Sequence, residues 1–488
     1  MKNIIWIALI LLGLSSCKKW LDVNPVSQVP EEDLFKTPEG FEEAINGVYT
    51  SCTDENLYGY QLSCGFPEVL AQNYSWPGED ALHFKQTALY NYKDQDYIGR
   101  KDKAWTGLYH AIANCNLILK HLETNSDVLN AQRFALIKAE ALALRGFLHF
   151  DLLRLFAPSY KTGKGANAIP YVTDFSKTVT PMSTVTEVLK KIVADLEEAK
   201  KLIKPVDPIL TAGYVVGYNS NDTTTEQKNS SLFLQNRRHH MNYYAICGEL
   251  AKVYLYQEKN NEAIANAREV IDSKKFPWTK YEDLNNPEPM DKDRIFYKEL
   301  VFGWYAPNMK DTLASRFGGG LKGFVIEQTA GDELYETGGA GGEDLRFKNW
   351  FVPGSGSTTS KWYDLQKYKR DFERNLHDLM VPAIRLSEMY YIAAECLYDT
   401  DPAGAAAYFN TVRYNRGYID DVAAPDKETL IQELIKEARK EFYAEGQIFY
   451  MYKRLNRNIP GQKGGSTPAS DKIFVMPLPD NEIEFGNR

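Results

Sequence analysis

The side chains best suited to hold a ligand lie in the segment 72–80, Gln-Asn-Tyr-Ser-Trp-Pro-Gly-Glu-Asp. Tyr74 and Trp76 offer flat aromatic faces, and the amide of Asn73 both donates and accepts hydrogen bonds. Sugar rings have C–H faces that stack on aromatic rings, and hydroxyl groups that need polar partners. We therefore predict that this segment binds a sugar, although the same side chains could instead pack a loop against the body of the protein.

Five more aromatic side chains, all in the region 274–380, are candidates for further ligand contacts. They are Trp278, Trp304, Tyr305, Trp350 and Trp362. The chain holds 31 Tyr and 8 Trp, and 13% of its residues are aromatic, which is more than a core alone tends to require. Packing is the alternative for each side chain, but we expect at least one of the group to contact the ligand.

No motif in the sequence matches a catalytic or cofactor site. Glycosidases place two carboxylates on either side of the substrate, whereas adjacent acids such as Glu79 and Asp80 project in different directions. The chain has no HExxH and no GxSxG, and the glycines at 318–320 are not followed by Lys and Ser or Thr. We predict a binding protein without catalytic residues, metal or cofactor; a surface glycoside hydrolase is the alternative.

Three glutamates are better explained as structural residues than as an acid and a base. Glu395, Glu441 and Glu445 lie in apolar helical segments, beside Arg385 and Arg439. A carboxylate in such surroundings needs a cation or a helix terminus nearby, because an unpaired buried charge is strongly unfavourable. We expect buried ion pairs or helix caps at these positions.

Charge and cysteine content narrow the class of protein further. The formal net charge is −8, and an acidic surface argues against nucleic acid as a partner, since phosphates require a basic face. Cys115, Cys247 and Cys396 lie in apolar helical patterns and are predicted to be core residues. Cys52 and Cys64 could form a disulfide outside the cell, but the sequence leaves this open.

The N-terminus has the pattern of an exported lipoprotein. Lys2 precedes an apolar run over 4–14, which suits a signal peptide and is too short to span a bilayer. The run ends in Leu-Ser-Ser-Cys17, which resembles the bacterial lipobox. We predict a signal peptide over 1–16, lipid on Cys17 and a tether over 17–30, so that acyl chains hold the protein to a membrane.

The remainder of the chain predicts a mainly α fold. Helical periodicity covers 40–50, 103–123, 130–156, 184–203, 242–257, 261–273, 381–398, 402–414 and 427–456. Ala251 and Ala263 are 12 residues apart, and so are Ala393 and Ala405. Small residues at this spacing let antiparallel helices pack closely, which is typical of tetratricopeptide (TPR) hairpins. The segments 130–156 and 184–203 could form a third pair.

We predict one domain over 31–488. Its helical TPR scaffold spans 31–273 and 381–488, and a loop-rich insertion with short strands occupies 274–380. The segment 299–304 is a predicted strand. Long loops on a rigid scaffold usually carry function.

Several segments, in order along the chain, resemble the SusD/RagB family of surface nutrient-binding lipoproteins. They include Trp-Leu-Asp-Val-Asn-Pro at 20–25, Leu-Arg-Gly-Phe-Leu-His-Phe-Asp-Leu at 144–152, and Arg-Lys-Glu-Phe-Tyr-Ala-Glu-Gly-Gln at 439–447. The resemblance implies a helical TPR fold at the cell surface of the outer membrane. It also implies a TonB-dependent β-barrel transporter of the SusC/RagA type as partner, to which the protein delivers glycans or, as in RagB-like members, peptides. In starch-binding relatives a Trp at about the place of Trp76 helps to form an aromatic arc.

Overall fold

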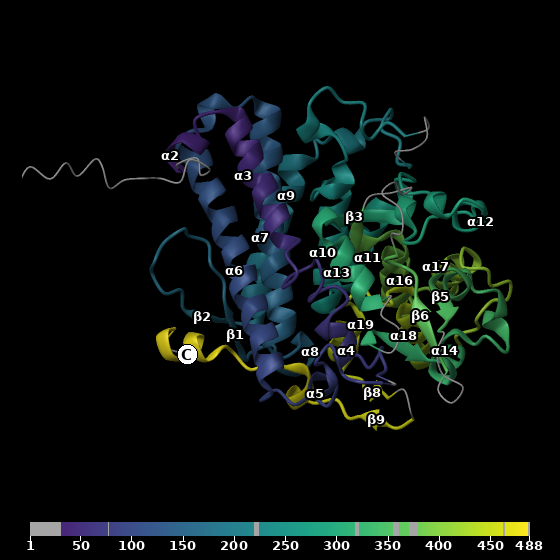
Figure 1. The fold of residues 1–488 in the computed structure, drawn as a ribbon. Coiled ribbons are helices and arrows are strands. Elements are labelled where there is room, and N and C mark those ends of the chain that lie inside the picture. The colour runs from purple at the N-terminus through teal and green to yellow at the C-terminus, as the bar shows by residue number, and fades with distance from the viewer. Residues whose placement is uncertain are drawn as a thin grey trace, which may run out of the picture.

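The computed structural model describes residues 31–76, 78–218, 224–317, 322–354, 361–369, 379–461 and 464–486 (Figure 1). The predicted signal peptide at 1–16, the lipidated Cys17 and the tether at 17–30 lie outside the described residues. Among the described helices, none has both the length and the apolar character needed to cross a membrane.

Nine longer helices form the scaffold of the described chain. They are α3 (Pro38–Cys52), α6 (Gln95–Thr124), α7 (Ala131–Phe156), α9 (Val185–Ile203), α10 (Tyr243–Tyr256), α11 (Asn260–Asp272), α16 (Leu386–Leu397), α17 (Pro402–Tyr414) and α18 (Lys427–Glu441). From α6 onward each packs on the next, except that α18 returns to α16 (Figure 1). This succession of antiparallel pairs confirms the TPR-like fold, including the predicted pairing of α7 with α9.

The helix boundaries follow from local hydrogen bonding. Asp94 caps α6 by accepting from the N–H of Tyr97 (3.1 Å), and Asn130 caps α7 by accepting from the N–H of Arg133 (2.8 Å). Such caps satisfy N–H groups that the first helical turn leaves without partners. Close packing between helices relies on small side chains, and the alanines that the sequence singled out in α10, α11, α16 and α17 are fully buried.

One predicted helix begins earlier in the structure, since α6 starts at Gln95 and not at 103, and two others are shortened or divided. Residues 381–385 are not helical, because β7 (Met380–Arg385) pairs with β3 (Leu300–Tyr305) in an antiparallel ladder. This ladder confirms the predicted strand near 299–304. The predicted helix 427–456 is interrupted after α18 and resumes as α19 (Ile448–Leu455), because Ala444 (φ 62°) and Gly446 (φ 73°) adopt left-handed backbone conformations between the two.

The remaining elements are short. The short helices are α2 (Glu31–Leu34), α4 (Phe66–Leu70), α5 (Lys85–Ala88), α8 (Tyr160–Gly163), α12 (Tyr281–Leu284), α13 (Lys310–Phe317), α14 (Gln328–Tyr335), α15 (Leu345–Trp350), α20 (Asp471–Phe474) and α21 (Asp480–Phe485). The short strands are β1 (Asn167–Pro170), β2 (Met182–Thr184), β4 (Val325–Glu327), β5 (Phe351–Pro353), β6 (Trp362–Leu365), β8 (Ile459–Pro460) and β9 (Ser466–Thr467). β4, β6 and β5 form a three-stranded sheet in the region 274–380, whereas β1 pairs with β2 and β8 with β9.

Fully buried ion pairs tie the region 274–380 to the helical scaffold. The guanidinium of Arg416 lies between Glu299 (2.6 Å) and Glu441 (2.7 Å). Arg346, just after the α15 N-cap, contacts Glu437 (2.8 Å) and also Glu441 (3.2 Å). We call these five residues the arginine network.

A second buried cluster lies next to the arginine network along the chain. Arg385 donates to Glu445 (2.7 Å), and Lys367 also pairs with this carboxylate. Glu395 instead pairs with Arg454 (2.6 and 2.7 Å). The structural interpretation of the three glutamates is therefore confirmed, although only Glu445 pairs with Arg385.

All five cysteines in the described part of the chain are buried free thiols. Cys52 and Cys64, which the sequence left open as a pair, form no disulfide. Burial raises the pKa of Cys64 to about 12, so this thiol stays protonated and unreactive at neutral pH.

We expect Glu441→Gln to lower the free energy of unfolding by about 3–5 kcal/mol, because it leaves Arg346 and Arg416 short of a buried counter-charge. Urea denaturation measures the change. The matched control is Glu343→Gln, which removes the exposed pair with Lys348 and is expected to cost less than about 1 kcal/mol. Equal losses in the two variants would contradict the role given to the network.

Candidate functional site

The structure joins the segment 73–76 to the region 274–380. The N–H of Ser75 donates to the carbonyl of Val325 in β4 (2.7 Å), and the N–H of Glu327 donates to the Ser75 hydroxyl (3.2 Å). A single antiparallel bridge at Ser75 therefore joins the segment to the free edge of β4. Two parts of the chain that the sequence proposed as ligand-binding are thus in direct contact.

A buried carboxylate in α4 fixes the other side of this segment. Glu68 accepts hydrogen bonds from the Asn73 side chain (2.8 Å) and from the backbone N–H groups of Ala444 (2.9 Å) and Gly446 (2.7 Å). Burial raises the pKa of Glu68 to about 7, although these hydrogen bonds favour the charged form. Glu68 thereby links the segment 73–76 to the turn between α18 and α19.

Two residues predicted to contact a ligand are core residues. The ring of Tyr74 stacks on Phe324 (4.2 Å between centroids), and its hydroxyl donates to the carbonyl of Cys64 (3.0 Å). Asn73 is also buried, and its amide holds Glu68. The ring of Tyr74 is enclosed and positions the loop instead of facing a ligand, whereas Asn73, although almost fully buried, reaches the wall of the surface pocket described below.

The three tryptophans at 304, 350 and 362 are at most 2% exposed and do not fit the predicted ligand contacts. Trp304 stacks on Tyr58 (4.5 Å between centroids), and Trp350 lies under the ammonium of Lys367 (4.0 Å from the ring centroid). The indole N–H of Trp362 donates to Asp364 (3.1 Å). Each ring packs the region 274–380 onto itself or onto the scaffold, which was the alternative interpretation of these residues.

Three predicted aromatic residues keep accessible surface. Trp76 and Trp278 are half-buried, and Tyr305 is 41% exposed. Tyr305 stacks on His239 (5.2 Å), whereas Trp278 packs on Tyr390 (5.2 Å). These three are the aromatic side chains from the sequence prediction that remain available to a ligand.

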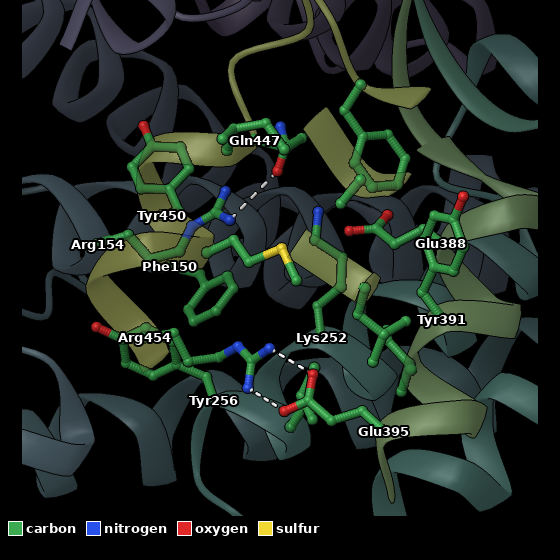
Figure 2. A pocket seen from close by; sticks show the side chains of 17 residues that line it. Phe150, Arg154, Lys252, Tyr256, Glu388, Tyr391, Glu395, Gln447, Tyr450 and Arg454 are labelled. Carbon is green, nitrogen blue, oxygen red and sulfur yellow. Dashed lines mark hydrogen bonds and ion pairs between the residues drawn. The ribbon is translucent and has the colours of Figure 1, made fainter. Parts of the chain in front are cut away.

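An interior cavity of about 90 Å³ lies among α7, α10, α16, α18 and α19 (Figure 2). The carboxylate of Glu388 and the ammonium of Lys252 point toward each other there, and Glu395 is neutralised by Arg454. Burial raises the pKa of Glu388. Although Glu388 and Glu395 share one face of α16, the cavity is far smaller than the ~300–1,000 Å³ of ligand sites. It has room for a few water molecules and none for a sugar chain.

A surface pocket of about 670 Å³ has the size of a ligand site. It lies between α14 and α18, which pack against each other, and extends to α19 and β8 (Figure 1). Its wall includes Asn73, Ile326, Glu333, Arg439, Tyr452 and Pro460. We call it the α14–α18 pocket.

The sequence did not predict the α14–α18 pocket, because its walls come from segments far apart in the chain. Arg439 was named as a neighbour of the three glutamates, for which ion pairs or helix caps were expected, but it pairs with none of them: among the described residues no hydrogen bond or ion pair holds its side chain, and its Nε is buried without a partner. The sequence assigned Arg439 to a segment that resembles the family, and that resemblance does not indicate that its side chain lacks a partner. Also among the described residues, no group of three or more His, Cys, Asp or Glu side chains could hold a metal ion.

Comparison with known proteins identifies the family to which this chain belongs. The SusD family model matches residues 207–484, which is more than half of the chain, and a second family model, described as "Starch-binding associating with outer membrane", matches residues 19–208. The chain belongs to the SusD family. The two matches together cover the scaffold, the α14–α18 pocket and the segment 73–76.

Relatives and solved structures agree with this assignment. SusD-like protein P38 of Formosa agariphila is 22% identical over 98% of this chain and 95% of its own length. SusD-like protein P2 of the same species is 26% identical, but the match covers 39% of this chain and only 36% of that protein. A SusD superfamily protein from Bacteroides thetaiotaomicron superposes with a TM-score of 0.71 at 21% identity, over 92% of this chain and 98% of its own. This likeness shows that the SusD-family fold is shared.

We expect the free energy of unfolding to fall as the pH is lowered from about 5 to about 2. Burial opposes ionisation of Glu437 and Glu140, yet Arg346 and Lys440 lower the pKa of Glu437 to about 2, and Arg237 and His240 do the same for Glu140. The unfolded chain, with carboxyl pKa values near 4.5, binds these protons first. Each carboxylate therefore contributes roughly 3 kcal/mol at most above pH 5.

Urea denaturation between pH 7 and pH 3 measures this slope. Glu437→Gln should unfold at lower urea and show a shallower loss of stability with acid, because one titrating group is gone. Glu343→Gln, which alters an exposed pair, serves as the control and should keep the wild-type slope. A Glu437→Gln slope equal to that of wild type would refute this assignment of the acid sensitivity.

Proposed function

We propose that this protein is an outer-membrane lipoprotein that binds oligosaccharide or polysaccharide and delivers it to a TonB-dependent β-barrel transporter of the SusC/RagA type. The observation that carries the proposal is the α14–α18 pocket, an open cavity of ligand size on the SusD-family fold. Binding is better supported than hydrolysis, because the two carboxylates that line the interior cavity are enclosed in a space too small for a sugar chain, and Glu395 is paired with Arg454.

The lining of the pocket suits a sugar chain. Polar residues such as Asn456, Asn458 and Ser466, together with Arg439, line the pocket beside apolar side chains such as Ile326 and Leu334. Sugars need this combination of hydrogen-bonding groups and apolar surface. Trp76 follows Asn73 by three residues, which supports its predicted role as an aromatic contact at the edge of the site. The starch-binding description of the matched family model agrees with this ligand class.

Membrane attachment is proposed from the N-terminal sequence. Cleavage before Cys17 and lipid on that cysteine would leave residues 17–30 as a strap between the membrane and α2. The matched family model describes association with the outer membrane, which supports this location. A strap of this kind lets the body move over a transporter while it stays anchored.

Trp76→Ala should weaken glycan binding about 2- to 10-fold, because loss of one stacked aromatic ring costs roughly 0.5–1.5 kcal/mol. Calorimetry against a panel of oligosaccharides and peptides measures affinity and ligand class together. Tyr281→Ala, at an exposed aromatic in α12, is the control and should bind like wild type. Unchanged affinity in a folded Trp76 variant would exclude this contact.

The same panel tests the alternatives. Product analysis after long incubation should find every oligosaccharide intact; turnover that one carboxylate substitution abolishes would establish the hydrolase instead. Binding of peptides alone would establish the RagB-like alternative.

Cys17→Ala should release the protein from the outer membrane, since the acyl chains have no other attachment site in the sequence. Membrane fractionation of expressing cells measures the shift into soluble fractions. Mild detergent extraction of the wild type should recover a large β-barrel protein with it. Repeated extraction without any such protein would count against the transporter partner.

A further inference from the structure

The helix α18 presents two faces of opposite character. Glu437 and Glu441 belong to the arginine network and are fully buried. Arg439 is two residues from each, and two residues turn a helix by about 200°. Arg439 therefore points away from the network, toward the α14–α18 pocket, where it lies half-buried.

Most enclosed arginines of the described chain contact a carboxylate, whereas Arg439 does not; half-buried Arg316, which lies over the ring of Tyr60, lacks such a contact as well. Arg237, Arg346, Arg385 and Arg416 each contact at least one carboxylate. The side chain of Arg439 has no such contact among the described residues, and its Nε is shielded from water without a hydrogen-bond partner. A partly desolvated cation without a counter-charge is unfavourable, so a ligand that supplies one gains affinity.

One hydroxyl group in the wall of the pocket also lacks a hydrogen-bond partner. The hydroxyl of Tyr452, another wall residue, is buried and unpartnered. Arg439 and Tyr452 line the same pocket, and the charge of Arg439 partly offsets the rise that burial causes in the pKa of Tyr452. The Tyr443 hydroxyl is already bonded to the carbonyl of Asn73 (2.7 Å).

The other charges of the pocket are already compensated or exposed. Lys436 pairs with Glu336 (2.5 Å), and Arg457 pairs with Glu428. Glu333 is exposed and makes no ion pair with Arg439 in this structure. The positive charge left for a ligand is therefore that of Arg439.

We propose that the α14–α18 pocket selects acidic glycans, with Arg439 binding the oxyanion of the sugar, either a uronate carboxylate or a sulfate ester. This inference rests on the proposed function and names its substrate class. The planar fork of a guanidinium matches two oxygens of such a group, and charge-assisted bonds of this kind are about twice as strong as neutral ones. Neutral sugars would leave the charge of Arg439 unpaired.

The experiment compares matched acidic and neutral ligands on the full mature chain. One arm uses uronic-acid oligosaccharides and their carboxyl-reduced forms, and the other uses sulfated oligosaccharides and their desulfated forms. In at least one arm, wild type should prefer the acidic form about 10-fold or more. Arg439→Gln should reduce that preference to less than about 3-fold, and Arg439→Lys should give an intermediate value, because it keeps the charge and loses the fork.

Two controls separate recognition from folding. Thermal unfolding should show that the Arg439 variants stay folded, and the affinity of Arg439→Gln for the neutral forms should equal that of wild type. Arg268→Gln removes a cation from α11, away from the pocket, and should leave the acidic preference intact.

The outcomes distinguish this inference from the proposed function. Equal binding of acidic and neutral forms, or an acidic preference that survives Arg439→Gln, overturns the inference and leaves glycan binding standing. Absence of binding to every glycan overturns both. Binding of acidic peptides through Arg439 without any glycan binding also overturns both and assigns the pocket to peptides.

Discussion

Arginines enclosed without water must meet carboxylates inside the protein, and this constraint organises the C-terminal half of the fold. Arg416 reaches Glu299 before β3 and Glu441 at the end of α18, while Arg346 reaches Glu437 and Glu441 from α15. If any one of these residues were removed, its partners would be left as buried charges without a full counter-charge in a medium of low dielectric. The region 274–380 therefore has one favourable position relative to the helices, although it contains little regular structure of its own.

The arginine network also determines where the α14–α18 pocket lies. Glu68 fixes the segment 73–76 to the turn between α18 and α19, and Ser75 extends the β4 edge. Because the network occupies one face of α18, the opposite face and Arg439 are left for the pocket. The position of the pocket is thus a consequence of how the two halves of the chain are tied together, and the proposed ligand meets an arginine that no carboxylate of the described protein pairs with.

The aromatic residues show why composition alone was a poor guide to the site. A long region with short strands and short helices needs a core, and large rings such as Trp304, Trp350 and Trp362 supply it. Trp76, Trp278 and Tyr305 have similar sequence surroundings but retain exposed surface. Nothing local in the sequence separates the two groups, because exposure depends on which distant segments cover each ring.

The sequence by itself determined the helices, their pairing and the structural role of the glutamates, since these follow from side-chain spacing over a few turns and from the cost of burying a charge. The sequence did not say which arginine each glutamate meets; the structure pairs Glu445 with Arg385. Only the tertiary structure decided that the helix after α18 breaks at Ala444, that the 73–76 segment joins β4, and that Arg439 faces a pocket. Each of these depends on contacts between segments far apart in the chain, and a local pattern carries no information about which side chains such contacts cover or leave without a partner.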